Sequence, residues 1–210
     1  MLSWRAPGDK VIRSVIAVFD YYREMTTRPK LTIAPSTRLR FRLMGENDAD
    51  LVFELDQDSE VMRFLNDGKP TPREEVDELH MPRILAFTDP VAGTGLWEMA
   101  DRESGEYLGW ILVREYGFGT DYHTPGNLEL GWRLKRKYWG QGLTTEAAKA
   151  IVDVVRHNPG VTVFSSLADI DNLASIGVMK NLGMHFVDDR VHKGPKGDMP
   201  VVYYEMINSF

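Results

Sequence analysis

Two glycines that flank a single residue form the stretch of this 210-residue chain with the clearest chemical potential. Gly140, Gln141 and Gly142 follow residues 127–134, where polar and apolar side chains alternate as in a β-strand, and a helical pattern begins at Leu143. Glycine lets the backbone approach a ligand closely, and a helix N-terminus presents unpaired N–H groups and a positive dipole. The order of strand, glycine turn and helix therefore predicts an anion site, and we expect a pyrophosphate there.

Taken alone, the glycine turn is compatible with more than one role. It lacks the spacing and the Lys-Ser/Thr ending of a nucleotide P-loop. It also lacks the three-glycine pattern of a dinucleotide-binding fold, with its acidic residue further along the chain. A single Gly-x-Gly turn is more often a tight connection between a strand and a helix. A second motif is needed to choose between these alternatives.

A second stretch, one helix and one strand downstream, makes the pattern specific. Residues 171–175 open a predicted helix, and residues 179–184 close it at a glycine. Together with residues 138–147, this stretch resembles the GCN5-related N-acetyltransferase (GNAT) superfamily, and most closely its ribosomal-protein N-terminal acetyltransferase (RimJ/RimL-like) branch. Residues 38–42 also resemble the first strand of that branch. The resemblance covers roughly residues 36–207, and its motifs are specific for the superfamily but only weakly specific for the acceptor.

The resemblance implies acetyl-CoA as the acetyl donor. Backbone N–H groups of residues 139–144 and the hydroxyl of Thr144 or Thr145 would bind the pyrophosphate, with Lys137 supplying charge where the family has Arg or Gln. The pantetheine would lie along residues 131–134 like an added strand, and a bulge there would free an N–H for the thioester carbonyl. The cofactor-binding residues implied are Trp132, Arg133, Leu134, Lys137, Trp139, Gly140, Gln141, Gly142, Leu143, Thr144, Thr145, Asn172 and Ser175.

Acetylation of an amine requires the neutral amine, although an α-amino group has a pKa of about 7.7–8.0 and a lysine about 10.4. A carboxylate can take the proton directly or through water. Glu129 matches the acidic position on this strand in many family members, so it is the predicted catalytic base. The alternative is an exposed polar position on an alternating strand. Glu98 and Asp101 are the other carboxylates considered for the same role.

The departing CoA thiolate needs a proton in many members of the superfamily. A tyrosine often supplies it, but the corresponding position is Met179 in this chain. Ser175 matches a serine of the related branch and is the predicted acid, whereas a serine in a first helical turn can also bond only to the backbone. Asn172 has two compatible roles: helix cap and, by family analogy, hydrogen-bond partner of the pantetheine.

The remaining elements must position these residues. Helices alternate with strands, and several strands are joined as hairpins, which predicts an α/β (α+β) fold with a mixed, mostly antiparallel sheet flanked by helices on both faces. Asn47 or Asp48 can cap a helix that runs to Leu55. Further strands are predicted at residues 37–43, 96–100, 107–113, 161–167, 184–191 and 201–206, and further helices at residues 73–87 and 143–158.

Composition narrows the range of partners. The chain has 25 Lys and Arg against 31 Asp and Glu, a net charge of −6, which argues against nucleic acid as a partner. A basic run nevertheless occupies residues 133–137. The chain has no cysteine, which excludes disulfides and fits a cytoplasmic protein. We expect no metal, because the histidines lack ligand spacing: His80, His123, His157, His185 and His192.

Residues 1–35 differ from the rest and are predicted to be an N-terminal extension, followed by an acetyltransferase domain at residues 36–210. The extension contains an amphipathic helix over about residues 11–22 and a proline-containing linker at residues 26–36. The helix could pack on the domain or a second subunit, lie on a membrane surface, or be upstream sequence read through before a start at Met25. It is too short and too charged to span a bilayer, so no membrane partner is expected.

The sequence therefore predicts an acetyl-CoA-dependent N-acetyltransferase that acts on a primary amine. The acceptor could be a protein N-terminus, a lysine or a small amine, and the sequence does not choose between them. The alternative is a non-catalytic acyl-CoA-binding or scaffolding module, since Met179 replaces a tyrosine acid and a fold can outlive its chemistry. A homodimer is expected only by analogy with the family.

Overall fold

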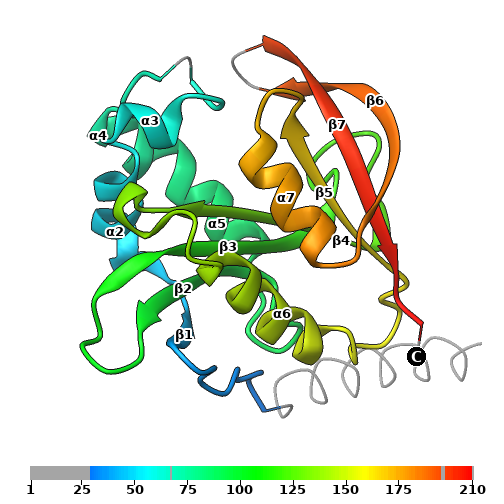
Figure 1. The fold of residues 1–210 in the computed structure, drawn as a ribbon, viewed down its shortest axis with the longest axis horizontal. Coiled ribbons are helices and arrows are strands. Elements are labelled where there is room, and N and C mark those ends of the chain that lie inside the picture. Colours follow the sequence, from blue (N-terminus) through cyan, green and yellow to red (C-terminus); the bar gives the residue numbers. More distant parts are fainter. Residues whose placement is uncertain (1–28, 67, 195–196, 210) are drawn as a thin grey trace, which may run out of the picture.

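A seven-stranded sheet forms the centre of the computed structural model, which describes residues 29–66, 68–194 and 197–209 (Figure 1). The strand order is β1-β2-β3-β4-β5-β7-β6, and every neighbouring pair is antiparallel except β4 and β5. The strands are β1 (Leu39–Leu43), β2 (Gly95–Asp101), β3 (Tyr107–Tyr116), β4 (Thr124–Leu134), β5 (Val163–Asp169), β6 (His185–Gly194) and β7 (Gly197–Ile207). The predicted mixed, mostly antiparallel sheet is confirmed.

Helices cover both faces of the sheet, and Figure 1 shows α6 and α7 together on one of them. They are η1 (Glu46–Asp48), α2 (Ala49–Leu55), α3 (Ser59–Met62), α4 (Arg73–Glu75), η2 (Val76–His80), α5 (Met81–Phe87), η3 (Arg136–Tyr138), α6 (Leu143–Val155) and α7 (Leu173–Asn181). Alternate residues of a strand face opposite sides: Trp97 and Ile111 pack with α6 and α7, whereas Leu96 packs with α2, η2 and α5. None of the helices in the described ranges has the length and apolar character to cross a bilayer.

The segment before β1 packs against the domain. The amphipathic helix predicted near residues 11–22 lies outside the described residues. Residues 29–36, predicted as the end of a linker, have no regular secondary structure. Ile33 is nevertheless buried in the main core, and the N–H of Leu31 donates to the carbonyl of Pro90 at 2.7 Å. This stretch therefore contributes side chains to the core that the proline pattern did not reveal.

The helical elements differ from prediction in two places. Asp48 occupies the N-cap position of α2 but makes no capping bond. Its carboxylate instead accepts the guanidinium of Arg42 and the N–H of Gly45, and the hydrogen bond from Arg42 holds the pKa of Asp48 below its usual value. The helix predicted at residues 73–87 is present, but its middle turn, η2, has π-helical pairing.

Strands β4 and β5 separate soon after they pair. Their parallel ladder joins only residues 127–129 to residues 163–165. A buried network holds the strands at this point: the Ser165 hydroxyl donates to Asn127 at 2.7 Å, and the amide of Asn127 donates to the Tyr203 hydroxyl at 2.9 Å. Burial, together with a hydrogen bond to Glu205, raises the pKa of Tyr203 to about 12. The network ties β4, β5 and β7 together at the base of the split.

Beyond this point, one edge of β4 faces a gap. The carbonyl of Leu130 accepts the hydroxyl of Ser166 at 2.8 Å, and the carbonyl of Leu134 accepts the indole N–H of Trp139 at 2.8 Å. Because the N–H and C=O groups of one extended residue point the same way and alternate along the strand, the main chain of Trp132 faces the same gap. The bulge expected at residues 131–134 is not found: the β3–β4 register is unbroken from Leu128 to Leu134.

Candidate active site

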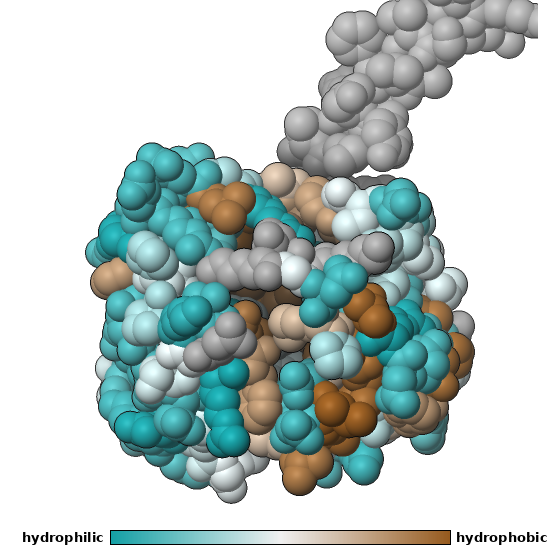
Figure 2. Space-filling model, turned by 90° about the horizontal axis from the view of Figure 1, so that it is seen from above, coloured by the Kyte–Doolittle hydropathy of each residue, from teal (hydrophilic) through white to brown (hydrophobic). Residues whose placement is uncertain are grey.

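A cavity of about 670 Å³ occupies the place where β4 and β5 part. Its walls come from α3, β3, β4, the glycine turn, β5, α7, β6 and β7. The opening is visible in Figure 2 as a hollow bordered by both apolar and polar side chains. The residues predicted from the sequence that line it are Glu129, Trp132, Arg133, Leu134, Trp139, Gly140, Gly142, Leu143, Thr144, Thr145, Asn172 and Ser175. The cavity thus joins both predicted motifs.

The glycine turn presents a helix start to one end of this cavity. Gly140 and Gly142 have φ angles of 73° and 74°, in the left-handed region that favours glycine, and Gly142 is the N-cap of α6. No side-chain bond caps this helix, and its first backbone bond runs from the N–H of Glu146 to the carbonyl of Gly142 at 3.0 Å. The preceding N–H groups, including those of Leu143 and Thr144, have no partner within the helix. An anion of the right size can accept them.

Residues far away in sequence hold the glycine turn in place. Nη1 of Arg38 donates to the carbonyl of Gln141 at 3.0 Å, and Nε of Arg38 lies 2.7 Å from Oε2 of Glu146. The hydroxyl of Ser36 donates to the other oxygen of Glu146 at 2.7 Å. The start of the domain therefore clamps the turn to the first turn of α6. This clamp leaves no signal in the sequence, because only the fold brings these side chains together.

The basic run at the end of β4 is matched by carboxylates. Arg133 pairs with Asp56, Nζ of Lys135 lies 2.7 Å from Glu54, and Nε of Arg136 lies 3.4 Å from Asp58. Three acidic residues in and between α2 and α3 thus face three cations in β4, in η3 and at the residue between them.

Lys137, the fourth cation of the run, belongs to the opposite flank of the turn. It pairs with Glu106 on the loop between β2 and β3, and this hydrogen bond raises the pKa of the ammonium group. Lys137 and Gln141 are the two predicted cofactor residues outside the lining of the cavity. The ammonium group of Lys137, expected to supply charge to the pyrophosphate site, is therefore paired with Glu106 in this structure.

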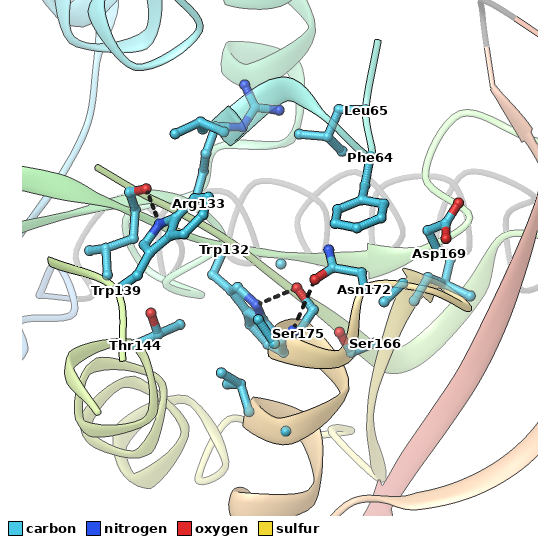
Figure 3. Close-up of a pocket in the computed structure, with 18 of the residues that line it drawn as sticks. Phe64, Leu65, Trp132, Arg133, Trp139, Thr144, Ser166, Asp169, Asn172 and Ser175 are labelled. Carbon is cyan, nitrogen blue, oxygen red and sulfur yellow. Dashed lines mark hydrogen bonds between the residues drawn. The ribbon is translucent and has the colours of Figure 1, made fainter. Parts of the chain in front are cut away.

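Helix α7 supplies the polar groups opposite β4 (Figure 3). The predicted cap is confirmed: Oδ1 of Asn172 accepts the N–H of Ser175 at 3.1 Å. The hydroxyl oxygen of Ser175 accepts the indole N–H of Trp132 at 3.2 Å. That bond fills an acceptor site of the hydroxyl and leaves its proton free to donate. Met179, at the position of the family tyrosine, is fully buried in the core.

The other end of the cavity contains Glu129, which is held by a second strand. Both oxygens of its carboxylate accept from Arg114 on β3, at 3.1 Å from Nε and 2.9 Å from Nη2. Both side chains of this pair are largely buried, so the bidentate bond is shielded from water. Glu129 therefore faces the cavity as one half of an ion pair and is not the exposed strand residue of the alternative interpretation.

The two other candidate bases lie outside the cavity lining. The carboxylate of Glu98 lies 2.5 Å from Nε of Arg42. Asp101 accepts the N–H and the hydroxyl of Ser104 in the β2–β3 turn, and these bonds keep the pKa of Asp101 below its usual value. Both carboxylates are thus bound by residues outside the cavity, which accounts for their positions without a catalytic role.

Several residues that line the cavity were not predicted from the sequence. Phe64 and Leu65, after α3, line the cavity, and Figure 3 shows the ring of Phe64 facing Asn172. His192 on β6 and its cross-strand partner Met199 on β7 line the same end as Glu129. Burial is the main cause that lowers the pKa of His192. The strands predicted at residues 184–191 and 201–206 stop short of both residues, and a single sequence does not show which face of a hairpin borders a cavity.

His123 lies in the loop between β3 and β4 and is not among the residues that line the large cavity. Nε2 of His123 lies 2.5 Å from a carboxylate oxygen of Glu115, and the pair is exposed. Within the described ranges, no group of three or more His, Asp or Glu side chains is arranged to hold a metal ion.

Comparisons with known proteins converge on one family. The model of an acetyltransferase (GNAT) domain matches residues 38–185. The FsC-acetyl coenzyme A-N(2)-transacetylase of Aspergillus fumigatus is 27% identical over 80% of this chain and 71% of its own.

Two solved structures share the fold. An aminoglycoside acetyltransferase in complex with coenzyme A has a TM-score of 0.63 at 21% identity, over 80% of this chain and 94% of its own. RimL, an alpha-N-protein acetyltransferase also solved with coenzyme A, has a TM-score of 0.65 at 15% identity, over 84% and 98%. At these identities the structures show the fold alone, and their names give different acceptors.

Proposed function

Because this chain belongs to the GNAT acetyltransferase family, whose domain model matches residues 38–185, we propose that it transfers the acetyl group of acetyl-CoA to a primary amine. One observation carries the proposal: a single cavity joins an uncapped helix start behind two left-handed glycines to the unpaired edge of β4. A pyrophosphate fits the first feature, and an extended amide-containing chain fits the second.

The donor site follows from these two features. Backbone N–H groups at the start of α6 and the hydroxyls of Thr144 and Thr145 bind the pyrophosphate. The main chain of Trp132 faces the gap and pairs with the amides of the pantetheine, while Asn172 approaches from α7. Coenzyme A bound to structural relatives supports this assignment. The thioester then lies between Ser175 and the end of the cavity that contains Glu129.

The reaction at this position needs two proton transfers. The acceptor amine must lose a proton before it attacks the carbonyl carbon, and the sulfur that leaves must gain one. Ser175 supplies the second, because its hydroxyl proton is free while its oxygen accepts from Trp132. Glu129 provides the negative charge that attracts the ammonium group, although Arg114 occupies both of its oxygens.

Acetyl-CoA is expected to stabilise the folded protein. A ligand that binds only the native state adds about 2.7 kcal/mol when present at 100 times its dissociation constant, which raises the melting temperature by roughly 5–10 °C in a chain of this size. Thermal denaturation with and without acetyl-CoA measures the shift. ATP, which has phosphates but no pantetheine, is the control ligand, and no shift with acetyl-CoA would contradict the donor site.

Turnover is tested by thiol release with a panel of amines: a peptide with a free N-terminus, a lysine peptide, a polyamine and an aminoglycoside. The panel is needed because the relatives named above act on different acceptors by their names. Thiol release with one of these amines would establish the transferase. A melting shift with no turnover on the whole panel would instead favour the non-catalytic acyl-CoA-binding module.

Ser175→Ala is expected to lower kcat by about 100-fold, the lower end of the range for general acid–base catalysis. The variant removes the proton donor but leaves the backbone bond to Asn172 in place. Ser175→Thr keeps the hydroxyl and is the matched control. Steady-state thiol release measures kcat for both variants, and equal rates for wild type and Ser175→Ala would remove the serine from the mechanism.

A further inference from the structure

His192 stands between two cavities. The large cavity and a smaller one of about 100 Å³ share His192 and Leu167 among their lining residues. Tyr116 and Tyr122 also line the smaller cavity, and Tyr122 is 37% exposed to solvent. The imidazole thus borders the large cavity on one side and, on the other, a smaller cavity that is also lined by Arg190, whose Nη1 donates to the Tyr116 hydroxyl at 3.0 Å.

The charges that face His192 come from three other elements. Glu129 on β4 acts on the imidazole with negative charge, while Arg114 on β3 and Arg83 on α5 act on it with positive charge. Burial disfavours the imidazolium further and is the largest of these effects, so the pKa of His192 lies below its ordinary value. These surroundings favour the uncharged ring, in which one of the nitrogens is an acceptor.

Glu129 is less suited to accept a proton in this setting. Arg114 donates two bonds to it, one to each oxygen, and such bidentate pairing favours the ionised carboxylate. A proton on either oxygen would break one of these bonds inside a largely buried pair. The carboxylate can stabilise a positive charge beside it without accepting the proton. This division of roles matches an imidazole that becomes charged next to a fixed anion.

We propose that His192 accepts the proton of the acceptor ammonium group and releases it to solvent through the smaller cavity, with Glu129 stabilising the charged imidazole. This catalytic role rests on the proposed transferase function. The ammonium gives one proton to His192, and the neutral nitrogen then attacks the acetyl carbon to form the N–C bond. The C–S bond breaks, Ser175 donates its hydroxyl proton to the thiolate, and the second nitrogen proton restores the Ser175 hydroxyl. The products are an amide, free thiol and one proton.

The test is the pH dependence of kcat/KM for His192→Asn, measured with whichever panel amine the wild type acetylates. Wild-type kcat/KM should fall as the pH drops through the pKa of His192, which lies below about 6.5. In the variant, kcat/KM should be about 100-fold lower and should not show this fall at low pH, which we call the acidic limb. His185→Asn, an exposed histidine on the same strand, is the matched control and should retain both the rate and the limb.

The Glu129→Gln variant distinguishes His192 from Glu129 as the group that accepts the proton. Since Glu129 raises the pKa of His192, this variant should keep the acidic limb but shift it to lower pH. A limb that persists in His192→Asn, or an unchanged rate in that variant, would overturn the proposal. So would a limb that disappears only in Glu129→Gln.

Failure of the general function has a different signature, because the wild type itself would then release no thiol with any amine. A preserved melting shift with acetyl-CoA in His192→Asn shows that the variant is folded and that its donor site is intact. Loss of the limb in such a folded variant supports the proton transfer, since a purely structural effect would lower the rate equally at every pH.

Discussion

Gly109→Ala is expected to lower the free energy of unfolding by more than about 4 kcal/mol, a size reserved for changes that disrupt packing directly. A Cβ at Gly109 would lie 2.1 Å from the carbonyl oxygen of Arg133 and 2.9 Å from the Cα of Leu134. Its φ of 155° also disfavours a side chain. Backbone atoms cannot yield as a side chain can, so β3 and β4 must separate beside the cavity. Urea unfolding measures the loss.

Gly45→Ala is the control for this substitution. Gly45 has an extended φ of −141°, and a Cβ there would meet no atom within 4 Å. The free energy of unfolding of Gly45→Ala should stay within about 0.5 kcal/mol of that of the wild type. If Gly109→Ala unfolds at the same urea concentration as Gly45→Ala, the close approach of β3 and β4 is contradicted. A weakened melting shift with acetyl-CoA in Gly109→Ala would extend the effect from the fold to the donor site.

Asp56→Ala is expected to lower the free energy of unfolding by about 3–5 kcal/mol, because it leaves the largely buried guanidinium of Arg133 without its counter-charge. Asp56 is fully buried, and its two oxygens accept from Arg133 and, at 2.9 Å, from the hydroxyl of Thr71. The pair joins the end of α2 to β4, where Arg133 lines the cavity. Equilibrium urea unfolding measures the change.

Asp50→Ala provides the matched control on the same helix. Asp50 also pairs with an arginine, Arg73, but its side chain is 82% exposed. Exposed pairs contribute about 0–1 kcal/mol to stability. Asp56→Ala should therefore lower the free energy of unfolding several times more than Asp50→Ala. Equal costs would show that burial of the Asp56 carboxylate does not control the energetics of its ion pair.

Local patterns in the sequence predicted most of the fold. Alternation identified the strands that became β2, β3 and β4, and a 3.6-residue period identified α6, because both patterns repeat within one element. The glycine turn and Asn172 were predictable for a related reason. A left-handed glycine and a helix cap depend on neighbours a few residues away.

The parts that could not be predicted depend on contacts between distant segments. Arg114 binds Glu129 across 15 positions, and Arg38 binds Glu146 across 108. His192 reaches the cavity only because β6 is the edge strand beside β7. A side chain that finds a tertiary partner leaves no periodic signal, which also explains Asp48: its carboxylate binds Arg42 of β1 in place of the first turn of α2.

The carboxylates paired with the basic run affect the rate at which an anionic ligand associates with the cavity. Four cations at residues 133–137 each have a carboxylate beside them, so they add little long-range attraction. The chain as a whole has a net charge of −6, and a phosphate-bearing ligand approaches against that field. Added salt screens such a field over about 10 Å at 0.1 M. We therefore expect added salt to speed the association with acetyl-CoA, the reverse of electrostatically steered association.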